Sequence, residues 1–223
     1  NNQVFISSAS TPDINNNRTL TNAQHIEISY NWLSGPYNPA FNINLDDSDL
    51  AKYVKISPLV HGKFSIKNPY TITFTPDAPW PADTKYTVRI SKRLFSKDVH
   101  PDRYSATFST KKIAATLDSF NTYPSPDNPK KLIGVAILSF NYPINTEHFA
   151  DKVSMRLDGK KIKFDIKFDR FHRTAFVISE PISVIDQEQD LRLKLNRVSA
   201  MYGHSDTEKI TGRRKRVLLR KRI

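Results

Sequence analysis

Cysteine, histidine and clustered carboxylates are the side chains that most often carry chemistry, and this sequence holds few of them in a useful pattern. It has no Cys, which excludes disulfides, thiolate zinc sites, cysteine nucleophiles and thioester chemistry from the chain. Its six His residues are dispersed, without the spacing of two ligands on one helical turn. They are His25, His61, His100, His148, His172 and His204. The sequence therefore predicts no metal site and no cofactor.

Carboxylates and hydroxyls indicate no catalytic site either. Asp46-Asp47-Ser48-Asp49 offers hard oxygen ligands, but it lacks the glycine turn and distal glutamate of a calcium loop, so we interpret it as a helix cap. Asp165 and Asp169 lie among lysines on an exposed strand face. No Gly-x-Ser-x-Gly elbow is present, and the six glycines never cluster into a phosphate loop. These features favour a protein that is not an enzyme.

Positive charge at the end of the chain is the strongest chemical signal. The sequence carries 34 Lys and Arg against 22 Asp and Glu, a formal net charge of +12. More than half of that excess comes from the last eleven residues, which hold seven basic side chains and no acidic one. The basic residues are Arg213, Arg214, Lys215, Arg216, Arg220, Lys221 and Arg222. Such a run is a candidate contact for a polyanion or an anionic lipid surface. Because no aromatic residue interleaves with it, nucleic acid is the less favoured partner.

The same basic run has a second interpretation. It includes Val217-Leu218-Leu219 and Ile223, which supply the apolar residues of a β-strand. By length, a second domain still lacks its closing strand at Leu195. We therefore favour a last strand that continues into a solvated linker, and we keep the binding arm as the alternative.

Short strands must position these residues, because the dominant period of the sequence is two. His25–Asn31 alternates so that Ile26, Ile28 and Tyr30 share one face. Similar alternation is found at 70–75, 86–90, 106–108, 162–168, 176–178 and 191–195. One helix is expected, near Asp47–Lys52. The predicted fold class is all-β, with antiparallel sandwiches.

Two shorter features refine this picture. Asp158-Gly159 predicts a tight hairpin with positive φ, which joins a strand at 153–157 to one at 162–166. The longest apolar stretch, Leu132–Leu138, is far below the ~20 residues of a membrane helix. No transmembrane segment is therefore predicted.

An internal repeat predicts two domains. Ser29-Tyr30-Asn31 parallels Ser139-Phe140-Asn141, and 50–54 parallels 149–153. Further along, 71–74 parallels 175–178 and 86–90 parallels 191–195. Preserved order with variable offsets is typical of related strands joined by different loops. The predicted domains are 1–112, with an Asn-rich N-terminal lead, and 113–223.

The first domain resembles a bacterial immunoglobulin-like domain. The resemblance rests on Tyr-Val-Lys-Ile-Ser-Pro at 53–58, Gly-Lys-Phe at 62–64, Ile-Thr-Phe-Thr-Pro at 72–76, Pro-Ala-Asp-Thr-Lys-Tyr-Thr-Val at 81–88 and Tyr-Ser-Ala-Thr-Phe-Ser-Thr at 104–110. A second domain follows, with Phe-Asn-Tyr-Pro-Ile-Asn at 140–145 and the hairpin at 155–168. This tandem resembles the N-terminal region of bacterial alpha-2-macroglobulin-like proteins.

The resemblance implies two tandem immunoglobulin-like, macroglobulin-type sandwiches that act as noncatalytic positioning domains of a protease inhibitor. It also implies a periplasmic or cell-envelope location, with membrane anchoring through a lipidated N-terminus outside this sequence. The expected partners are the remaining domains of a larger chain, target proteases through that chain, and cell-envelope components. The bait region and the Cys-x-Glu-Gln thioester of such inhibitors have no counterpart here, so no trapping residue is assigned. An adhesin or envelope-binding module is the alternative function, and polyanion binding through the basic end is a third.

Overall fold

The chain separates into two compact units, residues 1–111 and 112–223. The structure is a computed structural model that describes residues 2–9, 25–32, 41–42, 44–97, 99–101, 103–185 and 187–216. The division falls one residue before the boundary expected from the repeat.

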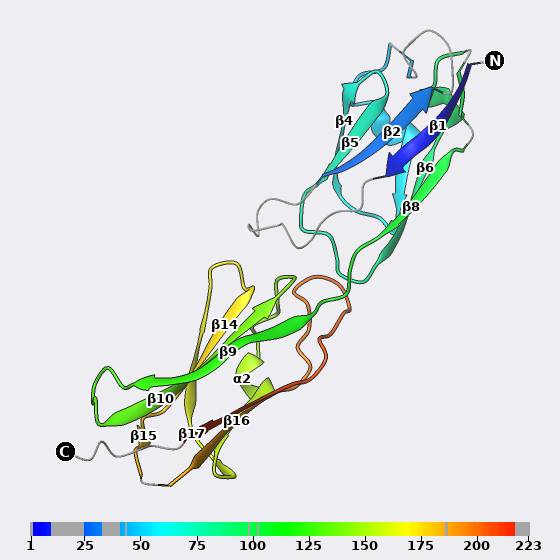
Figure 1. The fold of residues 1–223 in the computed structure, drawn as a ribbon. Coiled ribbons are helices and arrows are strands. Elements are labelled where there is room, and N and C mark those ends of the chain that lie inside the picture. The colour runs from blue at the N-terminus through cyan, green and yellow to red at the C-terminus, as the bar shows by residue number, and fades with distance from the viewer. Residues whose placement is uncertain are drawn as a thin grey trace. The chain divides into compact units, whose positions relative to one another are not determined.

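The first unit is a sandwich of a five-stranded and a three-stranded sheet (Figure 1). Its larger sheet has the order β4-β5-β2-β1-β7, and its smaller one the order β3-β6-β8. The strands are β1 Asn2–Ala9, β2 Ile26–Trp32, β3 Val54–Ser57, β4 Gly62–Asn68, β5 Thr71–Pro76, β6 Lys85–Ile90, β7 Val99–Pro101 and β8 Ser105–Ser109, with helix α1 Leu50–Tyr53 and 3-10 helix η1 Lys92–Leu94. The alternation predicted strands only from His25 onward, but β1 precedes them and pairs with β2 and, in parallel, with β7.

The second unit is a sandwich of the same kind. One sheet contains β13-β14-β10-β15 with β9 paired to β10, and the other has the order β12-β11-β16-β17. The elements are β9 Ala115–Pro124, β10 Lys131–Phe140, α2 Phe149–Lys152, β11 Val153–Leu157, β12 Lys160–Lys161, β13 Phe164–Phe168, β14 Thr174–Ser179, β15 Ile182–Ser183, β16 Gln189–Leu195 and β17 Ile210–Arg216. The prediction of all-β, immunoglobulin-like antiparallel sandwiches is confirmed.

Strand pairing repeats between the two units. In the first, β2 pairs with β5 and β6 pairs with β3 and β8. In the second, β10 pairs with β14 and β16 pairs with β11 and β17. The register corrects one part of the predicted repeat, because Ser29 faces Thr71 and Ser139 faces Thr174. Thr71 therefore corresponds to Thr174 and not to Ala175.

The two four-residue α-helices occupy matching positions. Helix α1 leads directly into β3, and helix α2 leads directly into β11. Each buries its first residue, Leu50 or Phe149, and exposes the two residues that follow. The expectation of a single helix was therefore wrong, because one buried side chain is enough to anchor a turn this short.

Alternation along the strands fills both cores. Ile26, Ile28 and Tyr30 are all buried, as their spacing predicts. In the first unit Trp80 packs edge-on against Tyr86 and Phe108, with ring centroids 5.0 and 5.3 Å away. Such offset and edge-on aromatic contacts add to the free energy gained from burial.

Two glycines show how closely the sheets of the second unit approach. A Cβ on Gly134 of β10 would lie 2.4 Å from Leu191 Cδ2 on β16. A Cβ on Gly212 of β17 would lie 2.5 Å from Leu117 Cδ2 on β9. These contacts join the inner faces of opposite sheets into one core.

The hairpin at Asp158-Gly159 is confirmed, with φ of 48° and 81°. Its second strand differs from the prediction. After the bond from Ile162 N to Met155 O, the chain leaves this sheet, and β13 pairs with β14 in the opposite one. Half-buried alternation fits either sheet, so the sequence could not show this crossing. No helix of the described residues is long and apolar enough to cross a membrane.

Gly62 provides a test of packing in the first unit. A Cβ there would lie 2.4 Å from Thr75 O and 2.6 Å from the ring of Phe74, and the carbonyl cannot move aside without breaking β5. Gly62→Ala is therefore expected to lower the free energy of unfolding of this unit by about 1–3 kcal/mol. Both tryptophans, Trp32 and Trp80, lie in this unit, so urea unfolding followed by tryptophan fluorescence measures it.

Gly159→Ala is the matched control. Gly159 lies in the second unit, which holds no tryptophan, so this substitution should leave the fluorescence midpoint unchanged even though its φ of 81° disfavours a side chain. An unchanged midpoint for Gly62→Ala would contradict the close approach of β4 to β5.

Candidate functional site

The basic run at the end of the chain begins inside the fold. Arg213, Arg214, Lys215 and Arg216 belong to β17, which pairs with β16 along seven registered residue pairs. A closing strand is therefore present in the second domain, but it spans Ile210–Arg216. The apolar residues on which the prediction rested, Val217-Leu218-Leu219 and Ile223, lie outside the described residues. Arg220, Lys221 and Arg222 lie outside the described residues.

The alternation of β17 separates its charged residues. Gly212 points inward against β9, so Thr211, Arg213 and Lys215 point outward. Arg214 occupies an inward position and lines a small pocket beside Leu157 and Leu191. A charged residue at an inward position of an edge strand is a common protection against edge-to-edge association.

The neighbouring strands extend the outward charge into a row. Arg213 is registered opposite Arg192 of β16, Arg192 opposite Arg156 of β11, and Arg156 opposite Lys161 of β12. Strands in a sheet lie about 4.8 Å apart, so the row crosses roughly 14 Å of the sheet. The adjacent row contains Ser154, Lys194 and Thr211.

We define the basic face as the outward cations of this sheet. It consists of Arg156, Lys161, Arg192, Lys194, Arg213 and Lys215, all of them exposed. Six cations and three carboxylates, Asp158, Asp190 and Glu188, leave this surface with a net charge of +3.

Asp190 connects two arginines of the row. Its carboxylate accepts bonds from Arg213 Nε and Nη2 at 2.8 and 2.9 Å, and from Arg192 Nε at 2.8 Å. These hydrogen bonds hold the pKa of Asp190 far below its ordinary range, and the bonds from Arg213 have the largest effect. Asp190 in turn raises the pKa of Arg213. Only 18% of the Asp190 side chain is exposed. Asp190 therefore offsets the repulsion between two arginines that the register places side by side.

The other cations of the face have fewer partners. Lys215 Nζ lies 2.9 Å from Glu188 Oε1. Arg156 donates to Gly159 O at 2.9 Å. Within the part of the chain that the structure describes, Arg156, Lys161 and Lys194 have no carboxylate partner. These three cations are available to an external anion.

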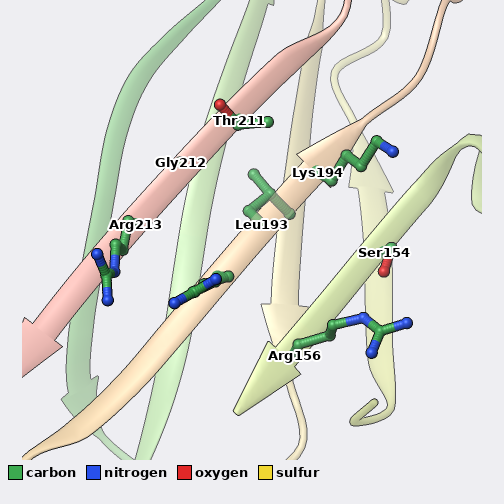
Figure 2. Close-up of a pocket in the computed structure, with 8 residues that line it drawn as sticks. Ser154, Arg156, Leu193, Lys194, Thr211, Gly212 and Arg213 are labelled. Carbon is green, nitrogen blue, oxygen red and sulfur yellow. The ribbon is translucent and has the colours of Figure 1, made fainter. Parts of the chain in front are cut away.

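A shallow groove of about 380 Å³ lies on this face. Figure 2 shows Arg156, Lys194 and Arg213 on three neighbouring strands that line it, with Ser154 on the strand of Arg156 and Thr211 on the strand of Arg213. The lining offers several cationic donors and two neutral ones, which is the chemistry of an anion-binding surface.

The sequence did not indicate four members of the basic face. Arg156, Lys161, Arg192 and Lys194 lie 19 to 57 residues before Arg213, and only the strand register unites them with it. The alternation Leu-Arg-Leu-Lys-Leu at 191–195 was the available signal, since it places two cations on one face of a strand.

The other sequence candidates have structural roles. Asp46 Oδ1 accepts bonds from the backbone N–H groups of Ser48 and Asp49 in the turn before α1, and Asp47 accepts one from Ile66 N. The N-cap residue of α1 is Asp49, whose side chain makes no capping hydrogen bond, so the interpretation of 46–49 as a helix cap was wrong. Asp169 accepts bonds from the backbone of Arg173 and Thr174 in the turn before β14. In the described ranges, no three His, Asp or Glu side chains gather as a metal site.

Comparison with curated proteins gives three relatives. An alpha-2-macroglobulin homolog of Yersinia pestis is 22% identical over 151 residues, which is 65% of this chain and 8% of the relative. The alpha-2-macroglobulin of Pasteurella multocida is 22% identical over 190 residues, 78% of this chain and 10% of the relative. That of Rickettsia conorii is 24% identical over 156 residues, 69% of this chain and 8% of the relative. The chain resembles the bacterial alpha-2-macroglobulins. The resemblance predicted from the tandem motifs is confirmed, and the chain spans 8–10% of the length of these relatives.

Other comparisons add little. No protein-family model matches the chain. Titin immunoglobulin domains match with a TM-score of 0.29 and 12% identity, covering 88% of this chain and 59% of theirs. The N-terminal eight immunoglobulin domains of DSCAM match with a TM-score of 0.28 and 10% identity, covering 92% of this chain and 27% of theirs. The fold assignment therefore rests on the sheets of the chain itself.

The Asp190 cluster predicts a pH dependence. Because folding lowers the pKa of Asp190, its contribution to stability is fully present above the ordinary Asp range and is lost as pH falls below it. Asp190→Asn is therefore expected to destabilise the second unit at neutral pH, and its difference from wild type should shrink in acid. Urea unfolding followed by far-UV circular dichroism measures this, with the tryptophan transition of the first unit as an internal reference.

Asp165→Asn is the control for that measurement, because Asp165 is an exposed carboxylate on the opposite sheet. A difference between Asp190→Asn and wild type that stays constant with pH would show that Asp190 acts through its shape and not through its charge.

Proposed function

We propose that this chain forms noncatalytic positioning domains of a bacterial alpha-2-macroglobulin-type protease inhibitor of the periplasm or cell envelope. The similarity to three curated alpha-2-macroglobulins is the observation that carries the proposal. Since the chain covers about a tenth of their length, the inhibitory activity is assigned to a longer protein that contains it. The chain itself then contributes structure and no chemistry to that activity.

The architecture supports a positioning role. Each unit is stabilised by strand pairing along two sheets, which makes it stiff along its own strands. Hydrogen bonds also hold residues 111–113 to the unit in which each lies. Asp83 N donates to Lys111 O in the first unit, while Asn141 Nδ2 donates to Lys112 O in the second. Ile113 N donates to Ser205 Oγ, also in the second unit.

Protease assays test the proposed function. The complete protein that contains this chain is expected to inhibit a protease acting on a protein substrate, and the 223-residue chain alone is not. Deleting residues 1–223 from the complete protein should lower that inhibition, because the remaining domains lose their support. Hydrolysis of small test substrates by the isolated chain should equal the buffer blank.

Three results would contradict this function. They are inhibition by the isolated chain, inhibition by the truncated protein equal to that of the complete one, and no inhibition by the complete protein. Binding of the isolated chain to peptidoglycan or a host protein, together with the last result, would favour an adhesin.

The contacts of Asn141 supply a separate prediction. Its side chain accepts from Ala114 N at 2.7 Å and donates to Lys112 O at 3.0 Å, so it holds residues 112–114 to the second unit. Asn141→Ala should therefore increase hydrogen exchange at 112–114. Ser139→Ala is the control, because the Ser139 hydroxyl donates to Asp118 and not to residues 112–114. Equal exchange at 112–114 in Asn141→Ala and wild type would contradict this role of Asn141.

A further inference from the structure

The repeated fold allows a position-by-position comparison of the basic face with the first unit. In the first unit, Ser57 is registered opposite Thr87, and Thr87 opposite Thr107. Val54 and Ile90 pair at the start of that sheet, as Val153 and Leu195 do in the second unit. Counting from these pairs, the three hydroxyl residues occupy the positions of three arginines. The matched pairs are Ser57 with Arg156, Thr87 with Arg192, and Thr107 with Arg213.

The fold therefore does not require the arginine row. The same sheet of the first unit closes with three short neutral side chains at these positions. Like charges directly opposite one another also oppose strand pairing. Repulsion within the arginine row therefore weakens strand pairing, which argues against a purely structural role for these residues. Asp190 offsets only part of this repulsion, because it pairs with Arg192 and Arg213 but not with Arg156.

We propose that the basic face docks on a planar surface of anionic phospholipids through their phosphate groups. Charge complementarity is the first argument, because the face has a net charge of +3 and three of its cations lack a carboxylate partner among the described residues. Guanidinium groups bind phosphate through two parallel hydrogen bonds, and half of the face is Arg.

The arrangement of the cations favours a surface over a linear polymer. The row from Lys161 to Arg213 runs across four strands, roughly 14 Å. Along β17, the outward positions from Thr211 to Lys215 extend the face by roughly 13 Å in the perpendicular direction. A linear polyanion follows one of these directions, whereas a layer of lipid phosphates meets both.

The outward side chains also determine the kind of contact. On β11, β16 and β17 the described outward positions hold no aromatic residue, so the face has neither a stacking platform for bases nor a ring to insert between lipids. The expected binding is peripheral and electrostatic. It should depend on anionic lipid and weaken with salt, since each basic side chain near such a surface contributes about a fivefold change in binding.

Removing the end of the chain is not a suitable test. Deletion of residues 213–223 would remove most of β17 and with it one edge of the second sandwich. Substitutions that copy the first unit keep β17 whole, because Ser and Thr are the residues with which the same fold closes this sheet. They also remove both arginine partners of Asp190, so Asp190→Asn, which loses the same bonds but keeps the three arginines, is measured beside them. The test variant is therefore Arg156→Ser, Arg192→Thr and Arg213→Thr combined.

The experiment measures partition of the 223-residue chain onto vesicles of phosphatidylglycerol mixed with phosphatidylcholine, with phosphatidylcholine vesicles as reference. Wild type is expected to bind the mixed vesicles in low salt and to dissociate in about 1 M NaCl, where the Debye length is about 3 Å. The triple variant should bind at least about tenfold more weakly. Far-UV circular dichroism of each variant establishes that it folds.

Two matched variants locate the effect. Lys55→Ser, Lys85→Thr and Arg89→Ser combined remove three cations from the corresponding sheet of the first unit, and this variant should bind like wild type. Arg220→Ser, Lys221→Ser and Arg222→Ser combined remove the last cations of the sequence, and this variant should retain most of the binding.

Several results would overturn the proposal. They include equal binding to both kinds of vesicle, an equal loss in the first-unit variant and the arginine-row variant, and a loss confined to the 220–222 variant. Preferential binding to duplex DNA or to polyglutamate over the mixed vesicles would assign the face to a linear polyanion. None of these measurements involves a protease, so they are independent of the inhibitory function.

Discussion

The antiparallel pairing of β16 with β11 on one side and β17 on the other determines both the core and the surface of the second unit. Leu191, Leu193 and Leu195 are all buried, and the residues between them point outward. A shift of one residue in this register would place Arg192 and Lys194 in the core. The core leucines therefore hold the outward cations in their rows, and the surface charge pattern follows from the packing of the interior. Asp190 is part of the same arrangement, because its position opposite Lys215 lies next to the row that holds Arg192 and Arg213.

Much of the fold could be predicted from the sequence, because alternation is a local property. Ile26, Ile28 and Tyr30 share a buried face, and Asp158-Gly159 forms the expected turn. Which strands pair with one another is not determined by local sequence. The alternation at Phe164–Phe168 identified a strand but not the sheet to which it belongs. Nothing in the local pattern around Arg156 or Arg213 indicates that the two residues share a row. The charge of the last residues drew attention to the end of the chain, whereas half of the basic face comes from β11 and β16.

The two units also show which parts of a shared fold are free to change. The buried pair Tyr86 and Phe108 of the first unit, stacked with centroids 5.1 Å apart, corresponds by register to Leu191 and Arg214 of the second. Both units have a second aromatic cluster, in which Tyr30 meets Phe41 and Phe95 edge-on in the first unit and Phe149 meets Phe140 and Phe168 edge-on in the second. The second unit therefore differs in lacking a ring pair between β16 and β17. Because no ring is needed at the end of β17, that strand can carry charge at successive positions.

Because the same fold occurs twice in this chain, a comparison of the two units shows which residues the fold requires and which are specific to one unit. Both units need a closing strand beside β6 or β16, and both have one, but only the second builds it from cations. Residues 1–112 and 113–212 carry small net charges of +4 and +1, so the excess at the end of the chain is not a general property of these domains. Selection for solubility would favour charges scattered over both units. The concentration of cations on one sheet, partly balanced by Asp190 so that the sheet can still pair, is the pattern expected when a surface must attract an anion without unfolding the strands that support it.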